Sequence, residues 1–102
     1  MKMNREDINV TKDNKIIVTI FGADKIGIVS AIARVMADCE VNIEDISQTT
    51  MQEYFVMFMM CDISQSRLTF SQIKEKILTQ AEELKMEVWV QKKEIFDNMH
   101  SI

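Results

Sequence analysis

The residues with the clearest chemical potential lie in one short turn, where a β-branched run leads into an amphipathic stretch. The turn holds both glycines of the chain, Gly22 and Gly27, with Asp24 between them. Glycine lets another group approach the main chain closely and adopts backbone angles that other residues resist. At the start of the following helix, N–H groups without intrahelical partners carry partial positive charge and can hold a small carboxylate. The turn is therefore a candidate ligand site, with turn geometry alone as the alternative explanation of the glycines.

The composition excludes several classes of protein. The 12 basic and 16 acidic residues give a formal net charge of −4, so the chain lacks the basic surface on which nucleic acids or anionic membranes bind. No apolar run approaches the roughly twenty residues that cross a bilayer, and residues 1–7 lack a secretory apolar segment. The 102 residues fit one domain. We therefore predict a cytoplasmic protein without nucleic-acid or membrane partners.

Residues typical of catalysis or metal binding are scarce. Cys39 and Cys61 lie in apolar patterns without the Cys-x-x-Cys spacing of a metal or redox site, so we predict two buried thiols. His100 is the only histidine and lies in the tail, where we expect it at the surface. The sequence thus predicts no catalytic residue, no metal site and no cofactor.

Hydrophobic periodicity divides the chain into alternating strands and helices. Residues 1–14 form a polar arm that we expect to be mobile, although Ile8 and Val10 could extend an edge strand. Residues 15–102 form the domain. We predict strands at 15–21, 41–51, 54–61 and 86–92, helices at 26–39 and 70–84, and a short helical turn near Ile95, Phe96 and Met99.

The two long helices have distinct sequence signals. Apolar residues of the first recur at helical spacing and predict its buried stripe: Ile28, Val29, Ile32, Val35, Met36 and Cys39. Thr69 and Gln72 have the Thr-x-x-Gln spacing of a capping box, which predicts the start of the second helix. An apolar stripe follows it, formed by Phe70, Ile73, Ile77, Ala81 and Leu84. Both helices are thus expected to pack one face on a sheet.

The element order β-α-β-β-α-β predicts an α+β, ferredoxin-like sandwich. Its four-stranded antiparallel sheet carries two helices on one face, with the first and third strands at the centre. The third strand, 54–61, is apolar on both faces, whereas two helices cover only one. A large uncovered apolar face usually marks an interface. We therefore predict a homodimer or higher homo-oligomer, formed through this face or through the edge strand 42–51.

The chain closely resembles the ACT domain, a small-molecule-binding regulatory module. The resemblance lies in the first strand, the Gly-x-Asp-Lys-x-Gly turn from Gly22 to Gly27, the helix beginning Ile28-Val29 and the Asn42-Ile43 pair. The resemblance covers nearly the whole chain from Lys15 onward. More narrowly, the chain looks like the single-domain ACT proteins, which are similar to the ACT part of the glycine cleavage system repressor. This narrower resemblance lies in the segment 42–49, in Glu53-Tyr54-Phe55 and in the Ile95-Phe96 tail. The arm before Lys15 departs from the usual pattern.

The resemblance implies a binding module and not an enzyme. Its ligand, often an amino acid, lies between two copies, against the first turn of one and the second strand of the other. Carried onto this sequence, the implied ligand-binding residues are Gly22, Asp24, Gly27, Ile28, Asn42 and Ile43. Asp24 is suited to accept hydrogen bonds from an ammonium group, with capping of the helix as an equal alternative. Asn42 offers a donor and an acceptor, or is simply a turn residue, and Asp45 is unusual in a strand and is expected to face solvent.

Other uses of the same fold lack their residues here. An acylphosphatase-like enzyme needs an arginine in the first turn, which offers only Lys25, and a copper carrier needs paired cysteines there. The aromatic residues of the central strands suit an RNA-binding domain, but the negative charge argues against it. A ligand-free module that uses its sheet to dimerise or to dock on another protein remains the alternative to a metabolite sensor.

Overall fold

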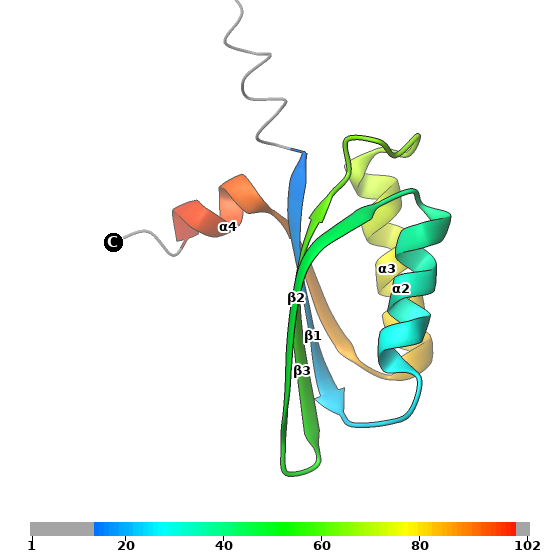
Figure 1. Ribbon diagram of the computed structural model, residues 1–102, viewed down its shortest axis with the longest axis vertical. Coiled ribbons are helices and arrows are strands. Elements are labelled where there is room, and N and C mark those ends of the chain that lie inside the picture. Colours follow the sequence, from blue (N-terminus) through cyan, green and yellow to red (C-terminus); the bar gives the residue numbers. More distant parts are fainter. Residues whose placement is uncertain (1–13, 100–102) are drawn as a thin grey trace, which may run out of the picture.

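The structure, a computed structural model, describes residues 14–99 and has three layers (Figure 1). The predictions for residues 1–13 and for His100 lie outside the described residues. The elements are β1 (Lys15–Ala23), α2 (Ile28–Asp38), β2 (Asn42–Met51), β3 (Tyr54–Asp62), α3 (Phe70–Leu84), β4 (Glu87–Lys92) and α4 (Lys93–Met99). This order confirms the predicted ferredoxin-like βαββαβ fold.

The four strands form one antiparallel sheet in the order β2-β3-β1-β4. β1 and β3 are central, as their heavy apolar content predicts, because the side chains of central strands lie furthest from the solvent at the sheet edges. β2 forms one edge, as predicted for this segment, and is exposed along nearly its whole length. The shorter β4 forms the other edge.

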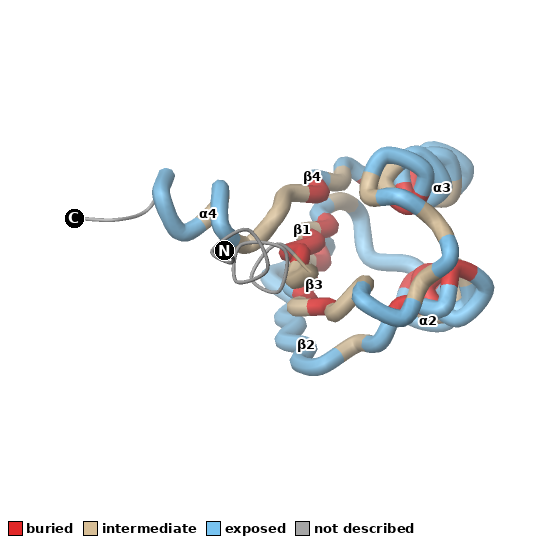
Figure 2. The backbone as a smooth tube through the Cα atoms, turned by 90° about the horizontal axis from the view of Figure 1, so that it is seen from above, coloured by how far each residue is buried: buried red, intermediate tan, exposed pale blue. Residues whose placement is uncertain are grey.

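The hydrophobic core lies between the sheet and the two helices α2 and α3, as Figure 2 shows from above. The alternation predicted for β3 is confirmed, since one of its faces supplies four core side chains: Phe55, Met57, Met59 and Cys61. β1 contributes Ile16, Val18 and Ile20 to the same layer. The opposite face of the sheet, which we call the open face, has no long helix over it.

The buried stripe of α2 is narrower than the sequence predicts. Ile28, Ile32 and Met36 are buried at intervals of four residues, and Cys39 is buried just after the helix. The prediction for Val29 was wrong, because its side chain is 38% exposed. Successive helical residues point about 100° apart, so Val29 turns away from the sheet once Ile28 points into it.

The sequence predicts the cap at the start of α3 but not the left-handed residues that follow α2 and α3. The capping box of α3 is confirmed, since Thr69 Oγ1 accepts from the Gln72 N–H at 3.2 Å and Gln72 Oε1 accepts from the Thr69 N–H at 2.9 Å. Lys85, after α3, and Glu40, after α2, have φ angles of 59° and 60°. These left-handed positions usually hold glycine, so neither helix carries the usual glycine signal at its C-terminal end.

The predicted terminal helical turn is present as α4, on the side of the sheet opposite α2 and α3 (Figures 1 and 2). Its Phe96 packs edge-on against Phe58 of β3, with ring centroids 6.0 Å apart. None of the residues of α4 is buried, and Ile95 and Met99 are exposed. α4 therefore shields part of the open face and leaves the rest accessible.

Candidate functional site

The turn between β1 and α2 presents the start of a helix to solvent. Gly27 caps α2 with φ 91° and ψ 2°, and its carbonyl accepts the first helical hydrogen bond from the Ala31 N–H at 3.0 Å. The N–H groups of residues 28–30 precede this bond, as expected for anion-binding amides at a helix start. A β-carbon on Gly27 would meet only Ser30 Oγ, at 3.9 Å. Gly27 is thus needed for its backbone angle and leaves open space before the helix.

Gly22 has a packing role that the sequence did not reveal. A β-carbon at this position would lie 2.6 Å from Sδ of Met86 and 3.1 Å from its Cε. Gly22 belongs to β1, and the residue that approaches its main chain closely is Met86, just before β4. The Met86 side chain therefore fills the space beside this glycine.

Asp24 does not cap the helix, so the alternative role considered for it was wrong. α2 has no side-chain cap, because Gly27 occupies the N-cap position. The main-chain N–H of Asp24 donates to the Glu53 carbonyl at 2.8 Å, which joins the β1–α2 turn to the β2–β3 hairpin. Its carboxylate is exposed and hydrogen-bonds to none of the residues that the structure describes. An acceptor of this kind is available to an incoming donor.

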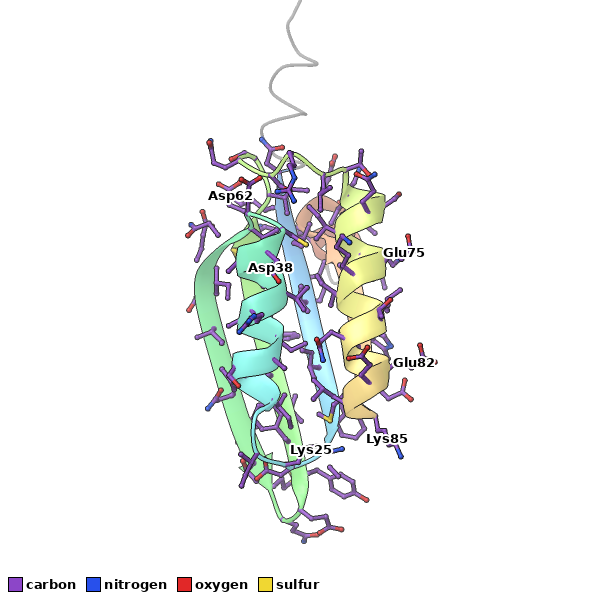
Figure 3. The ribbon with its side chains drawn as sticks, turned by 90° about the vertical axis from the view of Figure 1, so that its right-hand side faces the viewer. Lys25, Asp38, Asp62, Glu75, Glu82 and Lys85 are labelled. Carbon is purple, nitrogen blue, oxygen red and sulfur yellow. The ribbon has the colours of Figure 1, made fainter. Side chains whose placement is uncertain are left out.

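The neighbouring Lys25 is directed away from this carboxylate. Its Nζ donates to the Leu84 carbonyl at 2.7 Å, at the C-terminal end of α3, where a cation is favoured by the helix dipole. Figure 3 shows Lys25 and Lys85 at the same end of the molecule. Lys25 thus caps the C-terminal end of α3, and the negative charge of Asp24 is paired with no residue in the described range.

Asn42 and Ile43 begin β2, after α2 has crossed the sheet. Asn42 is exposed, lies opposite Asp62 in the register, and its side chain has no hydrogen-bond partner within residues 14–99. Ile43 packs against the core, as Ile28 does on α2, so both offer only main-chain groups to a ligand. The side chains able to contact a ligand directly are therefore those of Asp24 and Asn42.

A single chain does not bring the two halves of the predicted site together. Asn42 pairs with Asp62, which pairs with Lys15 at the start of β1, whereas Gly22 lies seven residues further along β1. At ~3.4 Å per residue this separation is about 24 Å. Figure 3 shows the same division, with Lys25 at one end of the molecule and Asp62 at the other.

The Asn42 end carries a charged cluster that the sequence did not predict. Lys15 Nζ bridges the carboxylates of Glu44 and Asp62, the latter at 3.4 Å. The hydrogen bond to Glu44 raises the pKa of Lys15 above its usual value. The Ser64 N–H donates to Asp62 at 2.8 Å and holds the pKa of that carboxyl below its usual value. These partners lie 29 and 47 residues apart in sequence, so no local pattern signals them.

A β-bulge accounts for the unusual Asp45. Ile43 lies opposite Cys61 and Asp45 opposite the adjacent Met60, so Glu44 has no partner of its own. The extra residue shifts the alternation and turns Asp45 to the open face. Its side chain is exposed, as expected, and accepts from the Ile46 N–H at 2.9 Å.

Two further classes of site are absent from the described residues. Residues 14–99 contain no group of three or more His, Cys, Asp or Glu side chains placed to share a metal ion. No helix in the same range is long and apolar enough to cross a membrane.

Comparison with known proteins identifies close relatives of the whole domain. The sequence profile of the ACT domain matches residues 14–91. A UPF0237 protein from Listeria innocua is 41% identical over 86 residues, which cover 84% of this chain and 97% of that protein. The structure of an ACT domain protein from Streptococcus pneumoniae is similar with a TM-score of 0.71 and 32% identity, covering 81% of this chain and 93% of that one.

A more distant structure shares the fold alone. A putative glycine cleavage system transcriptional repressor superposes with a TM-score of 0.69 at 17% identity, over 76% of this chain and 44% of the repressor chain. The likeness shows that the same fold occurs as one part of a longer chain.

Proposed function

Since the chain belongs to the ACT domain family, a family of regulatory domains, we propose that it is a cytoplasmic metabolite sensor that binds an amino acid, and not an enzyme. The ligand site is formed between two copies of the chain. The observation that carries this proposal is the position of the two half-sites at opposite ends of one exposed edge strand, β2.

β2 is the edge better suited to pairing with another chain. It is ten residues long, contains no proline, and bulges only near Asn42, whereas β4 has six residues. From Ile46 to Met51 it carries no charged side chain. Proteins normally protect exposed edges with short strands, charges or bulges, so the neutral, regular stretch from Ile46 to Met51 favours pairing with a partner strand.

Antiparallel pairing of β2 with its copy would complete the ligand site. Such pairing places Asn42 of the partner subunit beside Met51 of the first chain. The Met51 end adjoins the β1–α2 turn, because the Asp24 N–H holds the carbonyl of Glu53. A dimer with one two-fold axis would thus contain two complete sites, each formed by the β1–α2 turn of one chain and Asn42 of the partner subunit.

The completed site has the chemistry of a zwitterion receptor. The N–H groups at the start of α2 suit a carboxylate, and the carboxylate of Asp24, which pairs with no described residue, suits an ammonium group. Asn42 of the partner subunit supplies a donor and an acceptor between them. An α-amino acid carries both charges within one small ligand.

The oligomeric state tests the interface first. We expect light scattering at low micromolar concentration to give the mass of a dimer or a higher oligomer for the native chain. Ile46→Lys places a charge near the middle of the edge, and we expect it to yield monomers. Leu78→Lys on α3 is the matched control, since Leu78 is 40% exposed and Ile46 43%, and it should leave the mass unchanged. A monomeric native protein would contradict the interface.

Thermal unfolding tests the ligand. An amino acid at a hundredfold excess over its Kd adds about 2.7 kcal/mol, which raises Tm by on the order of ten degrees in a domain of this size. We expect at least one common amino acid at millimolar concentration to do so. Because Asp24 is not a cap, Asp24→Asn should lose this shift with little change in the ligand-free Tm. Asp38→Asn, at the other end of α2, should retain the shift.

The ligand-free alternative makes a different set of predictions. If the native protein is a dimer but no amino acid moves its melting curve or gives a calorimetric heat, the chain is an interaction module. If Ile46→Lys yields monomers that still bind the amino acid with native affinity, the site does not lie between two copies.

A further inference from the structure

The open face carries a group of exposed aromatic rings away from α4. Phe21 and Tyr54 stack with centroids 5.9 Å apart, and both are nearly half exposed. Trp89 on β4, the only tryptophan of the chain, is 68% exposed. Large aromatic side chains are rarely left exposed together without a partner.

The strand register places aromatic rings on several sides of a smaller side chain. Thr19 lies between Phe58 on β3 and Trp89 on β4, and Phe21 is the next residue of β1 that faces the same side. The shorter threonine leaves a hollow of about 390 Å³, which is within the range of small-molecule sites. Its lining is almost wholly apolar and consists of Thr19, Phe21, Val56, Glu87, Val88 and Trp89.

One charged group borders this hollow. Glu87 lies directly opposite Phe21 in the register and forms no ion pair or side-chain hydrogen bond with any residue in the described range. Two lysines on this side of the sheet are paired with other carboxylates. Lys15 pairs with Glu44 and Asp62, and Lys93 pairs with Asp97. Within residues 14–99, no cation pairs with this negative charge beside the aromatic faces.

We propose that this hollow binds a small organic cation, a substituted ammonium group with an apolar body. Aromatic faces attract cations through their quadrupoles, and a neighbouring carboxylate adds a favourable charge. The ligand's apolar groups cover Thr19 and Val56, while its charge lies between Glu87 and the rings of Phe21 and Trp89. The site is separate from the zwitterion site at β2 and does not depend on it.

Trp89 provides a direct measurement. We expect choline to change the intrinsic fluorescence of the native protein in a saturable way, with a Kd of about 1 mM or above, at constant ionic strength. The neutral isostere 3,3-dimethylbutan-1-ol has the same shape without the charge and should bind several-fold more weakly. Sodium chloride at the same concentration should have no saturable effect.

Two variants locate the binding while retaining the tryptophan. Glu87→Gln removes the charge with little change of shape and should weaken choline binding about threefold. Glu83→Gln, an exposed position on α3, is the matched control and should bind choline as the native protein does. Phe21→Leu removes one aromatic wall and should weaken binding by a similar factor.

Several results would overturn the proposal. Equal binding of choline and its neutral isostere would show an apolar hollow only, and equal effects of Glu87→Gln and Glu83→Gln would place the cation elsewhere. A Trp89 emission that shifts with protein concentration alone would show that a second copy covers the open face. Ile46→Lys distinguishes the two sites, since loss of the dimer should leave the choline response unchanged.

Discussion

A β-carbon placed on Gly22 would lie 2.6 Å from Sδ of Met86, closer than two such atoms can approach. The two residues are 64 positions apart and belong to neighbouring strand ends, where β1 and the entry to β4 converge on the core. A side chain at position 22 therefore requires the flexible end of Met86 to move.

Gly22→Ala should destabilise the protein by about 1 kcal/mol or less, because only the flexible end of the Met86 side chain must move to accept the new methyl group. Urea unfolding gives this change in the free energy of unfolding. In the double variant with Met86→Ala the added methyl group has space, so the two effects should be less than additive. Full additivity would show that Gly22 and Met86 do not interact in this way.

Gly27→Ala should also destabilise the protein, by about 1–2 kcal/mol, but for a different reason. The φ angle of 91° is unfavourable for any residue with a β-carbon, whereas the surrounding space is open. Gly27→Asn should cost less, because asparagine tolerates left-handed angles better than alanine does. Equal losses of stability for the two variants, measured in urea, would contradict a purely conformational cause.

Stability should fall in acid partly through Asp62. Its folded pKa lies below the ordinary 3.8, chiefly because the Ser64 N–H donates to the carboxylate. Because the pKa of Asp62 is lower in the folded than in the unfolded chain, its carboxylate contributes its full stabilisation when the pH is above the unfolded pKa. This contribution is lost as the pH falls below about 4 and the carboxylate is protonated. Asp62→Asn keeps an acceptor for Ser64 and should lessen the fall of Tm between about pH 5 and pH 2.

Asp38→Asn is the matched control for that measurement. Asp38 ends α2, is exposed, and makes no side-chain hydrogen bond with a described residue. Its variant should reproduce the native dependence of Tm on pH. If both variants flatten the acid limb equally, the effect reflects net charge and not the contact of Asp62 with Ser64.

The two cysteines should be unreactive in the native protein. Cys39 and Cys61 are buried, and burial raises the pKa of the Cys61 thiol to about 12. The thiolate is the reactive form, so a thiol reagent at neutral pH should modify both only when the chain unfolds. Ser71→Cys, at an exposed position of α3, should react at once and serves as the positive control. Rapid modification of a native cysteine would show local opening of the core.

The sequence by itself determined the elements and their faces. Alternation along β3 separated Phe55 and Met57 from Tyr54 and Phe58 correctly, and the capping box located the start of α3 at Thr69. These features depend on residues within a few positions of one another, where the periods of strand and helix are fixed by backbone geometry.

Only the tertiary structure decided which contacts the candidate site residues make. It shows that Gly22 lies against Met86, that Gly27 and not Asp24 caps α2, and that Asp24 and Asn42 lie at opposite ends of the sheet. It also gathered Phe21, Thr19 and Trp89 into one hollow. Each of these relations joins residues from different strands, and pairing register and close packing set them over distances that no local spacing in the chain encodes.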